Sequence, residues 1–77
     1  MTPSLLVRIN DGTYALHDGN RLHVGNFKWI NGQWKFKAMG YGPEGQVMPG
    51  HGPLTDRHNT LFAQLDEATI RTHFFKD

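Results

Sequence analysis

One segment of the sequence holds several side chains whose types could do chemistry. Residues 47–59 read "VMPGHGPLTDRHN" and include His51, Asp56 and His58. These side chains could supply the three protein ligands of a catalytic zinc site. The spacing His-x4-Asp-x-His is not a compact zinc pattern, however, and a metal would have to order a loop rich in glycine and proline. We therefore expect no metal, and we predict an irregular loop at residues 49–59.

The same segment resembles a short motif of a known enzyme family. In hydrolases of the metallo-β-lactamase fold, a "PGHGP" segment carries a zinc-binding histidine, and the matching residue here is His51. The resemblance covers residues 47–56 alone. That family also needs a His-x-His-x-Asp-His run, which this chain lacks, and 77 residues are too few for its fold. We therefore do not expect a zinc hydrolase.

Nucleophilic catalysis also lacks the residues it needs. The chain has no cysteine, and its only serine, Ser4, is not in a Gly-x-Ser-x-Gly context. No lysine follows the glycines of "GHGPLT", as a phosphate-binding loop requires. We therefore expect a protein that is not an enzyme and that uses no cofactor.

Turn signals define the elements that would position these residues. Asp11-Gly12, Asp18-Gly19 and Asn31-Gly32 each lie between alternating apolar runs, and such dipeptides favour hairpin turns. They predict antiparallel strands at residues 4–10, 13–17, 21–30 and 33–41. A "GPEG" turn predicts a fifth strand at 46–48, and "NTLFAQL" predicts a short strand at about 60–64.

The C-terminal segment has the features of a helix. Asp66 is a good N-cap, Glu67 favours the positive end of a helix, and Ile70 and Phe74 share one helical face. We predict a helix at residues 67–75. The predicted fold is therefore a single α+β domain over residues 1–77, an antiparallel meander of four to five strands with one C-terminal helix packed on its aromatic face.

Turn lengths also predict the strand registers. A two-residue turn at Asp11-Gly12, a three-residue loop at residues 18–20 and a two-residue turn at Asn31-Gly32 set these pairs opposite each other: Ile9 with Tyr14, Val7 with Leu16, Leu16 with Leu22, Tyr14 with Val24, Trp29 with Trp34, and Phe27 with Phe36. Apolar residues then switch from even to odd positions within one strand. The switch predicts a bulge or break at Gly25-Asn26.

An aromatic patch crosses the predicted hairpin around Asn31-Gly32. Its members are Phe27, Trp29, Trp34 and Phe36. Exposed aromatic rings can stack single-stranded bases. A chain this small needs a core, however, so we expect these rings to be buried under the helix. Trp29→Ala and Phe36→Ala should then each unfold most of the protein.

The opposite face of the predicted sheet is basic. With the registers above it carries Arg8, His17, Arg21, His23, Lys28, Lys35 and Lys37. The acids of this region fall in turns, so a net charge of +1 conceals a face of one sign. Lysines on a solvated sheet face can also serve only to keep it soluble and unpaired. We expect a binding face made of these residues, except His17, together with Arg57 and His58 from the loop.

The element order is similar to that of the small DNA-binding domains of phage-type integrase arms and of certain plant transcription factors, which place a sheet on DNA with a helix behind it. No residue motif is shared. Nothing is carried over from those domains, and it is the basic sheet face that leads us to expect a small non-catalytic binding module for nucleic acid or another polyanion. The alternative is a protein-interaction or assembly subunit that pairs with a partner, or with a second copy as a homodimer, through a strand edge.

Composition sets the remaining expectations. The first residues, "MTPSLLVRIN", lack a charged region and a long apolar run, so we expect no signal peptide. No apolar run approaches the length of a membrane span. The absence of cysteine fits the reducing cytoplasm.

Overall fold

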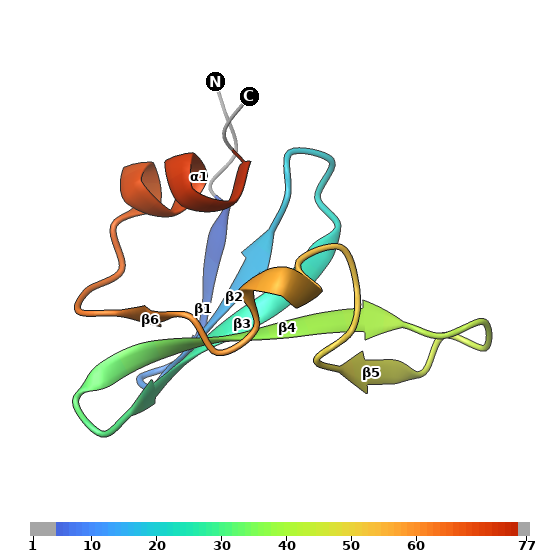
Figure 1. The fold of residues 1–77 in the computed structure, drawn as a ribbon, viewed down its shortest axis with the longest axis horizontal. Helices are drawn as coiled ribbons and strands as arrows, with labels where there is room; N and C mark the ends of the chain where they lie inside the picture. The colour runs from blue at the N-terminus through green and yellow to red at the C-terminus, as the bar shows by residue number, and fades with distance from the viewer. Residues whose placement is uncertain (1–4, 76–77) are drawn as a thin grey trace.

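An antiparallel meander makes up most of the protein (Figure 1). The computed structural model describes residues 5–75. Its elements are β1 (Leu6–Asn10), β2 (Thr13–His17), β3 (His23–Ile30), β4 (Gln33–Tyr41), β5 (Val47–Pro49), the 3-10 helix η1 (Thr55–Arg57), β6 (Leu61–Phe62) and α1 (Glu67–Phe75). The strand order is β1-β2-β3-β4-β5, with β6 also beside β4. The predicted fold class is therefore confirmed. The predicted start of the first strand, residue 4, lies outside the described residues.

The β3–β4 hairpin has the predicted register. Trp29 lies opposite Trp34, and Phe27 lies opposite Phe36. The turn residue Asn31 has a φ of 53° and the next residue a φ of 79°. Two consecutive positive φ values define the type I′ turn, which matches the twist of the strands and fixes their register.

The β1–β2 hairpin is shifted by one residue from the prediction. Leu6 lies opposite Leu16 and Arg8 opposite Tyr14, because Ile9 is an extra residue in β1. A shift of one residue exchanges the two faces of a strand. Leu6 therefore packs against the core, and Arg8 lies on the helix side of the sheet rather than on the predicted basic face.

The β2–β3 connection is longer than predicted. Residues 18–22 form it, with the Asp18 carboxylate accepting hydrogen bonds from the N–H groups of Asn20 at 2.8 Å and Leu22 at 2.9 Å. Arg21 adopts a left-handed φ of 67°. The predicted pairings with Leu22 and Val24 are therefore wrong.

Leu16 instead lies opposite Gly25 and Tyr14 opposite Phe27. Val24 is the extra residue of a bulge, one position before the predicted site. This bulge carries out the predicted change of face. It places Val24 in the core and leaves the residues after Gly25 in alternating order.

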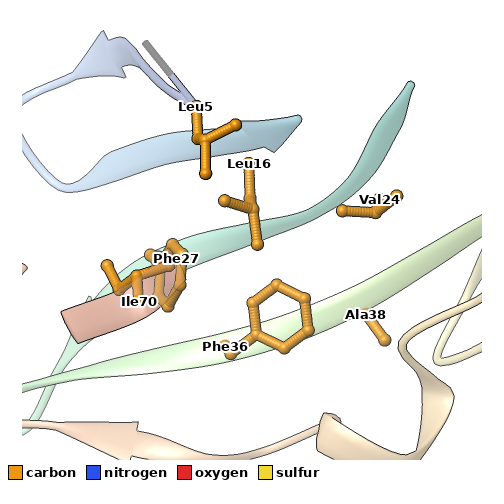
Figure 2. Packing of buried hydrophobic residues seen from close by; sticks show 7 residues of the cluster. All are labelled: Leu5, Leu16, Val24, Phe27, Phe36, Ala38 and Ile70. Atoms are coloured by element: carbon orange, nitrogen blue, oxygen red, sulfur yellow. The ribbon is translucent and has the colours of Figure 1, made fainter. Parts of the chain in front are cut away.

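The core lies between α1 and one face of the sheet (Figure 2). Phe27, Phe36 and Ile70 are completely buried, and the centroids of the Phe74 and Phe36 rings are 4.7 Å apart. The remaining buried members of the cluster are Leu5, Leu16, Val24 and Ala38. The helix therefore packs on the aromatic face, as predicted.

Trp29 departs from this pattern, because its side chain is 50% exposed. A nine-residue helix is about 13 Å long, whereas the nine-residue strand β4 extends about 30 Å. The helix therefore covers only part of the hairpin. Trp34 is still partly buried, because it packs against Tyr14 and lies opposite Phe62 of β6. The prediction that Trp29 is a core residue is wrong.

The segment between β5 and β6 closes the outer edge of β4. The Gly50 N–H donates to the Ala38 carbonyl at 2.8 Å, and the Ala38 N–H donates to Nδ1 of His58 at 3.0 Å. The Asn59 N–H donates to the Phe36 carbonyl at 2.7 Å. The predicted irregular loop is thus an ordered connector, with η1 in its second half.

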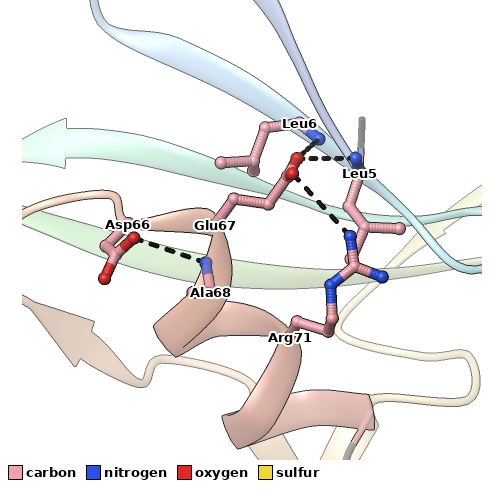
Figure 3. A network of polar contacts seen from close by, with 6 residues as sticks. All are labelled: Leu5, Leu6, Asp66, Glu67, Ala68 and Arg71. Carbon is pink, nitrogen blue, oxygen red and sulfur yellow. Dashed lines mark hydrogen bonds and ion pairs between the residues drawn. The ribbon is translucent and has the colours of Figure 1, made fainter. Parts of the chain in front are cut away.

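A polar contact joins the start of α1 to the start of the sheet (Figure 3). The Glu67 carboxylate accepts hydrogen bonds from the N–H groups of Leu5 at 2.8 Å and Leu6 at 3.4 Å. Its other oxygen lies 3.7 Å from the Arg71 guanidinium. Asp66 accepts the Ala68 N–H at 3.3 Å, which supports its predicted capping position.

Candidate anion-binding face

Three lysines lie together on the sheet face opposite α1. Lys28 and Lys35 are directly opposite each other in the β3–β4 ladder, and Lys37 follows two residues later in β4. Residues two apart in a strand share a face, and their neighbours Phe27 and Phe36 point to the helix. We call Lys28, Lys35 and Lys37 the lysine patch.

No carboxylate neutralises the lysine patch within residues 5–75. The ion pairs in this part of the chain join Arg8 to Asp11 and Arg71 to Glu67. Lys37 donates one hydrogen bond, from Nζ to the Asn59 amide oxygen at 2.8 Å. Like charges directly across a strand pair repel each other, so Lys28 and Lys35 favour an anion nearby.

A hollow opens beside two of these lysines. It has a volume of about 340 Å³ and is lined by Asn26, Lys28, Lys37, Ala38, Met39, Pro49 and His58. We call this feature the hollow. Its volume is at the lower end of the range of small-ligand sites. A second, more open depression follows the outer side of α1 and is lined by Ala68, Thr69, Thr72 and His73, without a cluster of charged groups.

The hydrogen bonds of His58 define its proton position. Its Nδ1 accepts the Ala38 N–H at 3.0 Å, so that nitrogen carries no proton. The neutral ring therefore has its proton on Nε2, which is a donor. His58 thus completes the β4 edge and is also one of the residues that line the hollow.

Asn26 is fixed by a histidine. His23 Nε2 lies 2.9 Å from the Asn26 amide oxygen, and His23 Nδ1 lies 3.1 Å from the Tyr41 hydroxyl. Since an amide oxygen only accepts, Nε2 is the donor, and in the neutral ring the Tyr41 hydroxyl donates to Nδ1. Among residues 5–75, the Asn26 NH₂ group has no hydrogen-bond acceptor.

The His23 ring also stacks on His17, with centroids 5.2 Å apart. Nδ1 of His17 is buried and has no hydrogen-bond partner among residues 5–75. These two rings support the end of the face beyond Asn26. They stabilise the position of Asn26 and do not line the hollow.

The structure brings together only some of the predicted binding residues. Lys28, Lys35, Lys37, His23 and His58 lie on or beside the face. Arg8 lies on the helix side and binds Asp11, Arg21 is in the β2–β3 loop, and Arg57 is exposed on η1 outside the hollow. The predicted common face therefore contains Lys28, Lys35 and Lys37, whereas the predicted positions of Arg8 and Arg21 on that face are wrong.

The sequence prediction did not include three residues that line the hollow, Asn26, Met39 and Pro49. Asn26 alternates with Lys28, so it shares that face once the bulge is placed before Gly25. Pro49 lies opposite Met39 through β5, a contact that residue spacing alone does not reveal. Within the described chain, no three histidine, aspartate or glutamate side chains group as a metal site, and His51 is exposed.

Comparison of the chain with protein-family models, with curated proteins and with solved structures finds no match. Within residues 5–75, no helix has the length and apolar character needed to span a membrane.

Proposed function

We propose that this protein is a small non-catalytic module that binds nucleic acid through its lysine patch. The observation that carries the proposal is the cluster of Lys28, Lys35 and Lys37 on the sheet face opposite α1, where residues 5–75 place no ion-paired carboxylate. Phosphates are the anions that such cationic surfaces neutralise, with release of counterions. The proposal also places the protein in the cytoplasm, because proteins of that reducing compartment rarely have disulfides and this chain has no cysteine.

Binding rather than catalysis also fits the groups around the hollow. Among the described residues its lining contains donors and apolar side chains without a carboxylate, serine or cysteine, and the basic nitrogen of its one histidine, His58 Nδ1, is occupied by the Ala38 N–H. Donors of this kind hold an anion in place without reacting with it. The predicted absence of a cofactor is part of the same proposal.

The experiment is a titration with fluorescent single-stranded and duplex oligonucleotides at several salt concentrations. With about three phosphate contacts, the slope of log K against log salt should be about −2 for single strands and about −3 for duplex. An absence of binding at low salt, or binding that is indifferent to salt, would exclude the proposal.

Lys35→Glu tests the patch directly. It converts the repulsive Lys28–Lys35 pair into an attractive one, so stability should be unchanged or rise by a few tenths of a kcal/mol. Oligonucleotide binding should weaken, and the slope of log K against log salt should become less steep by about one. Arg21→Glu is the control, because it makes the same charge change in the β2–β3 loop. Equal losses in both variants would assign binding to net charge rather than to the patch.

The alternative function, assembly through a strand edge, depends on β1. This outer strand has two half-exposed apolar side chains, Val7 at 49% and Ile9 at 58% exposure. Exposed edge strands recruit partner strands, whereas a bulge such as the one at Ile9 discourages them. Sedimentation across a concentration range tests this candidate, since a homodimer formed through β1 would dissociate on dilution and be lost in Val7→Lys.

A further inference from the structure

The hollow and the lysine patch overlap but are not identical. Lys28 and Lys37 line the hollow, whereas Lys35 does not. The patch is therefore divided into two lysines beside a concave site and a third, Lys35, that lies outside it. A ligand group that enters the hollow would contact the first two at close range.

The polar side chains around the hollow have donors to offer. Among the residues that the structure describes, Asn26 has two amide N–H groups without an acceptor, His58 has its Nε2 proton, and Lys37 uses one of its three donors on Asn59. Lys28 has no hydrogen-bond or ion-pair partner among the described residues. A phosphate group, which has only acceptor oxygens when ionised, is the ligand whose chemistry these donors match.

The apolar part of the lining strengthens this match. Met39 and Pro49 supply apolar side chains to the wall of the hollow, whereas Ala38 also borders it but has its side chain in the core. Apolar side chains beside the site reduce its contact with water, so a charge-assisted hydrogen bond to a bound anion is stronger there than on a flat polar surface. The volume of about 340 Å³ exceeds that of one phosphate and leaves room for the group attached to it.

We propose that the hollow seats one phosphate group, held by Asn26, Lys28 and Lys37 with His58 at its wall. The inference rests on the proposed function in that a nucleic-acid backbone would supply the phosphate. A small phosphomonoester presents the same chemistry. The experiment therefore includes inorganic phosphate, a nucleoside monophosphate and a single-stranded oligonucleotide as separate probes.

Asn26→Asp is the decisive variant. The carboxylate keeps an oxygen to accept the His23 N–H, so the support of this position is retained. It replaces the two amide donors with an acceptor and adds a negative charge inside the hollow. Gln33→Glu is the matched control, because Gln33 shares the face with Lys35, is exposed and lies outside the hollow, yet undergoes the same change of charge.

The readout is the titration of amide chemical shifts in the folded protein by NMR. Inorganic phosphate should shift the Asn26 side-chain amide and the backbone of residues 37–39, and chloride at equal ionic strength should not. Asn26→Asp should weaken phosphate binding by about tenfold or more, as expected for lost charge-assisted donors, and Gln33→Glu by a much smaller factor. The monophosphate should follow the same order.

The cross-strand lysine pair supplies a second matched comparison. Lys28→Gln should weaken the binding of inorganic phosphate, whereas Lys35→Gln should leave it nearly unchanged. Of these two lysines, Lys28 lines the hollow and Lys35 does not. Both variants should weaken oligonucleotide binding, because both lysines belong to the patch. A structural role alone would not produce this separation between the two ligands.

The outcomes separate this inference from the proposed function. If oligonucleotides bind but phosphate shifts no residue of the hollow, and Asn26→Asp matches Gln33→Glu, the phosphate seat is refuted while the basic face stands. If phosphate and the monophosphate bind in the hollow and oligonucleotides do not, the seat is supported and a small phosphomonoester replaces nucleic acid as its source. If no probe binds, both proposals fail.

Discussion

The exposure of individual aromatic side chains decides what each contributes to stability. Phe36 has no exposed surface, whereas Trp29 on the same hairpin is 50% exposed. Emptying a buried aromatic site costs about 3–5 kcal/mol, comparable to the whole stability of so small a core. Phe36→Ala should therefore be largely unfolded at 25 °C.

Trp29→Ala should remain folded. Half of the indole is already in water, and its edge-to-face contact with Trp34, at 5.3 Å between centroids, is the main specific interaction lost. We expect a loss on the order of 1–2 kcal/mol. Urea denaturation followed by circular dichroism compares the two variants. Equal losses would show that the hairpin end is covered in solution.

The two histidines of the connector between β5 and β6 differ in what they contribute to stability. His58 gives the Ala38 N–H its acceptor at 3.0 Å, whereas the side chain of the exposed His51 has no hydrogen-bond partner among residues 5–75. His58→Ala should cost about 1–3 kcal/mol, the penalty for an N–H left without a partner. His51→Ala should be neutral. Hydrogen exchange at the Ala38 amide is the measurement, and retained protection in His58→Ala would refute the role of His58.

At the level of elements, the bulge in β3 depends on one close approach. A Cβ added at Gly25 would lie 2.4 Å from Cζ of Phe36, inside van der Waals contact. Gly25→Ala must therefore displace a fully buried ring, and we expect a loss of about 1–3 kcal/mol. Gly19→Ala is the control, since nothing lies within 4 Å of its added Cβ. Thermal melting distinguishes them, and similar midpoints would argue against this packing.

Local turn chemistry determined which registers could be predicted from the sequence. The Asn31-Gly32 dipeptide strongly favours a two-residue turn, and this turn determines the register of β3 and β4. The other two hairpins needed knowledge of where extra residues lie. Ile9 and Val24 are bulge residues of ordinary type, and the Asp18 side chain stabilises a longer loop than its Asp-Gly dipeptide suggests.

For the whole molecule, the same division explains how much of the candidate site was predictable. Lys28, Lys35 and Lys37 belong to the hairpin with the fixed turn, so their common face followed from alternation. The hollow could not be predicted in this way. Its wall includes Pro49 and His58, and the segment that brings these residues beside β4 has no periodic pattern. Pairing across such a connector is a tertiary contact that no local pattern encodes.

The small helix has a consequence for the whole surface. Because α1 and the core occupy one side of the sheet, the lysines on the other side remain available to a ligand. The proposed binding face and the hydrophobic core therefore use different side chains of this small domain. Variants of the core should change stability, and variants of the patch should change binding.

Glu67 offers a test of how the two ends of the described chain support each other. Its carboxylate accepts the N–H groups of Leu5 and Leu6, more than 60 residues earlier in the chain. Glu67→Ala leaves those donors without this acceptor and should cost about 1.5–3 kcal/mol, the range for hydrogen bonds to charged groups. Glu67→Gln keeps an acceptor oxygen and should lose less.

The control for Glu67→Ala is Glu44→Ala, which removes the same charge from an exposed turn. Because the contact joins α1 to β1, Glu67→Ala should lower hydrogen-exchange protection in both elements at once. Oligonucleotide binding by the folded fraction should not change, since the lysine patch lies on the opposite face. Melting midpoints that coincide for Glu67→Ala and Glu44→Ala would show that the apolar contacts of the helix with the core are enough to hold it in place.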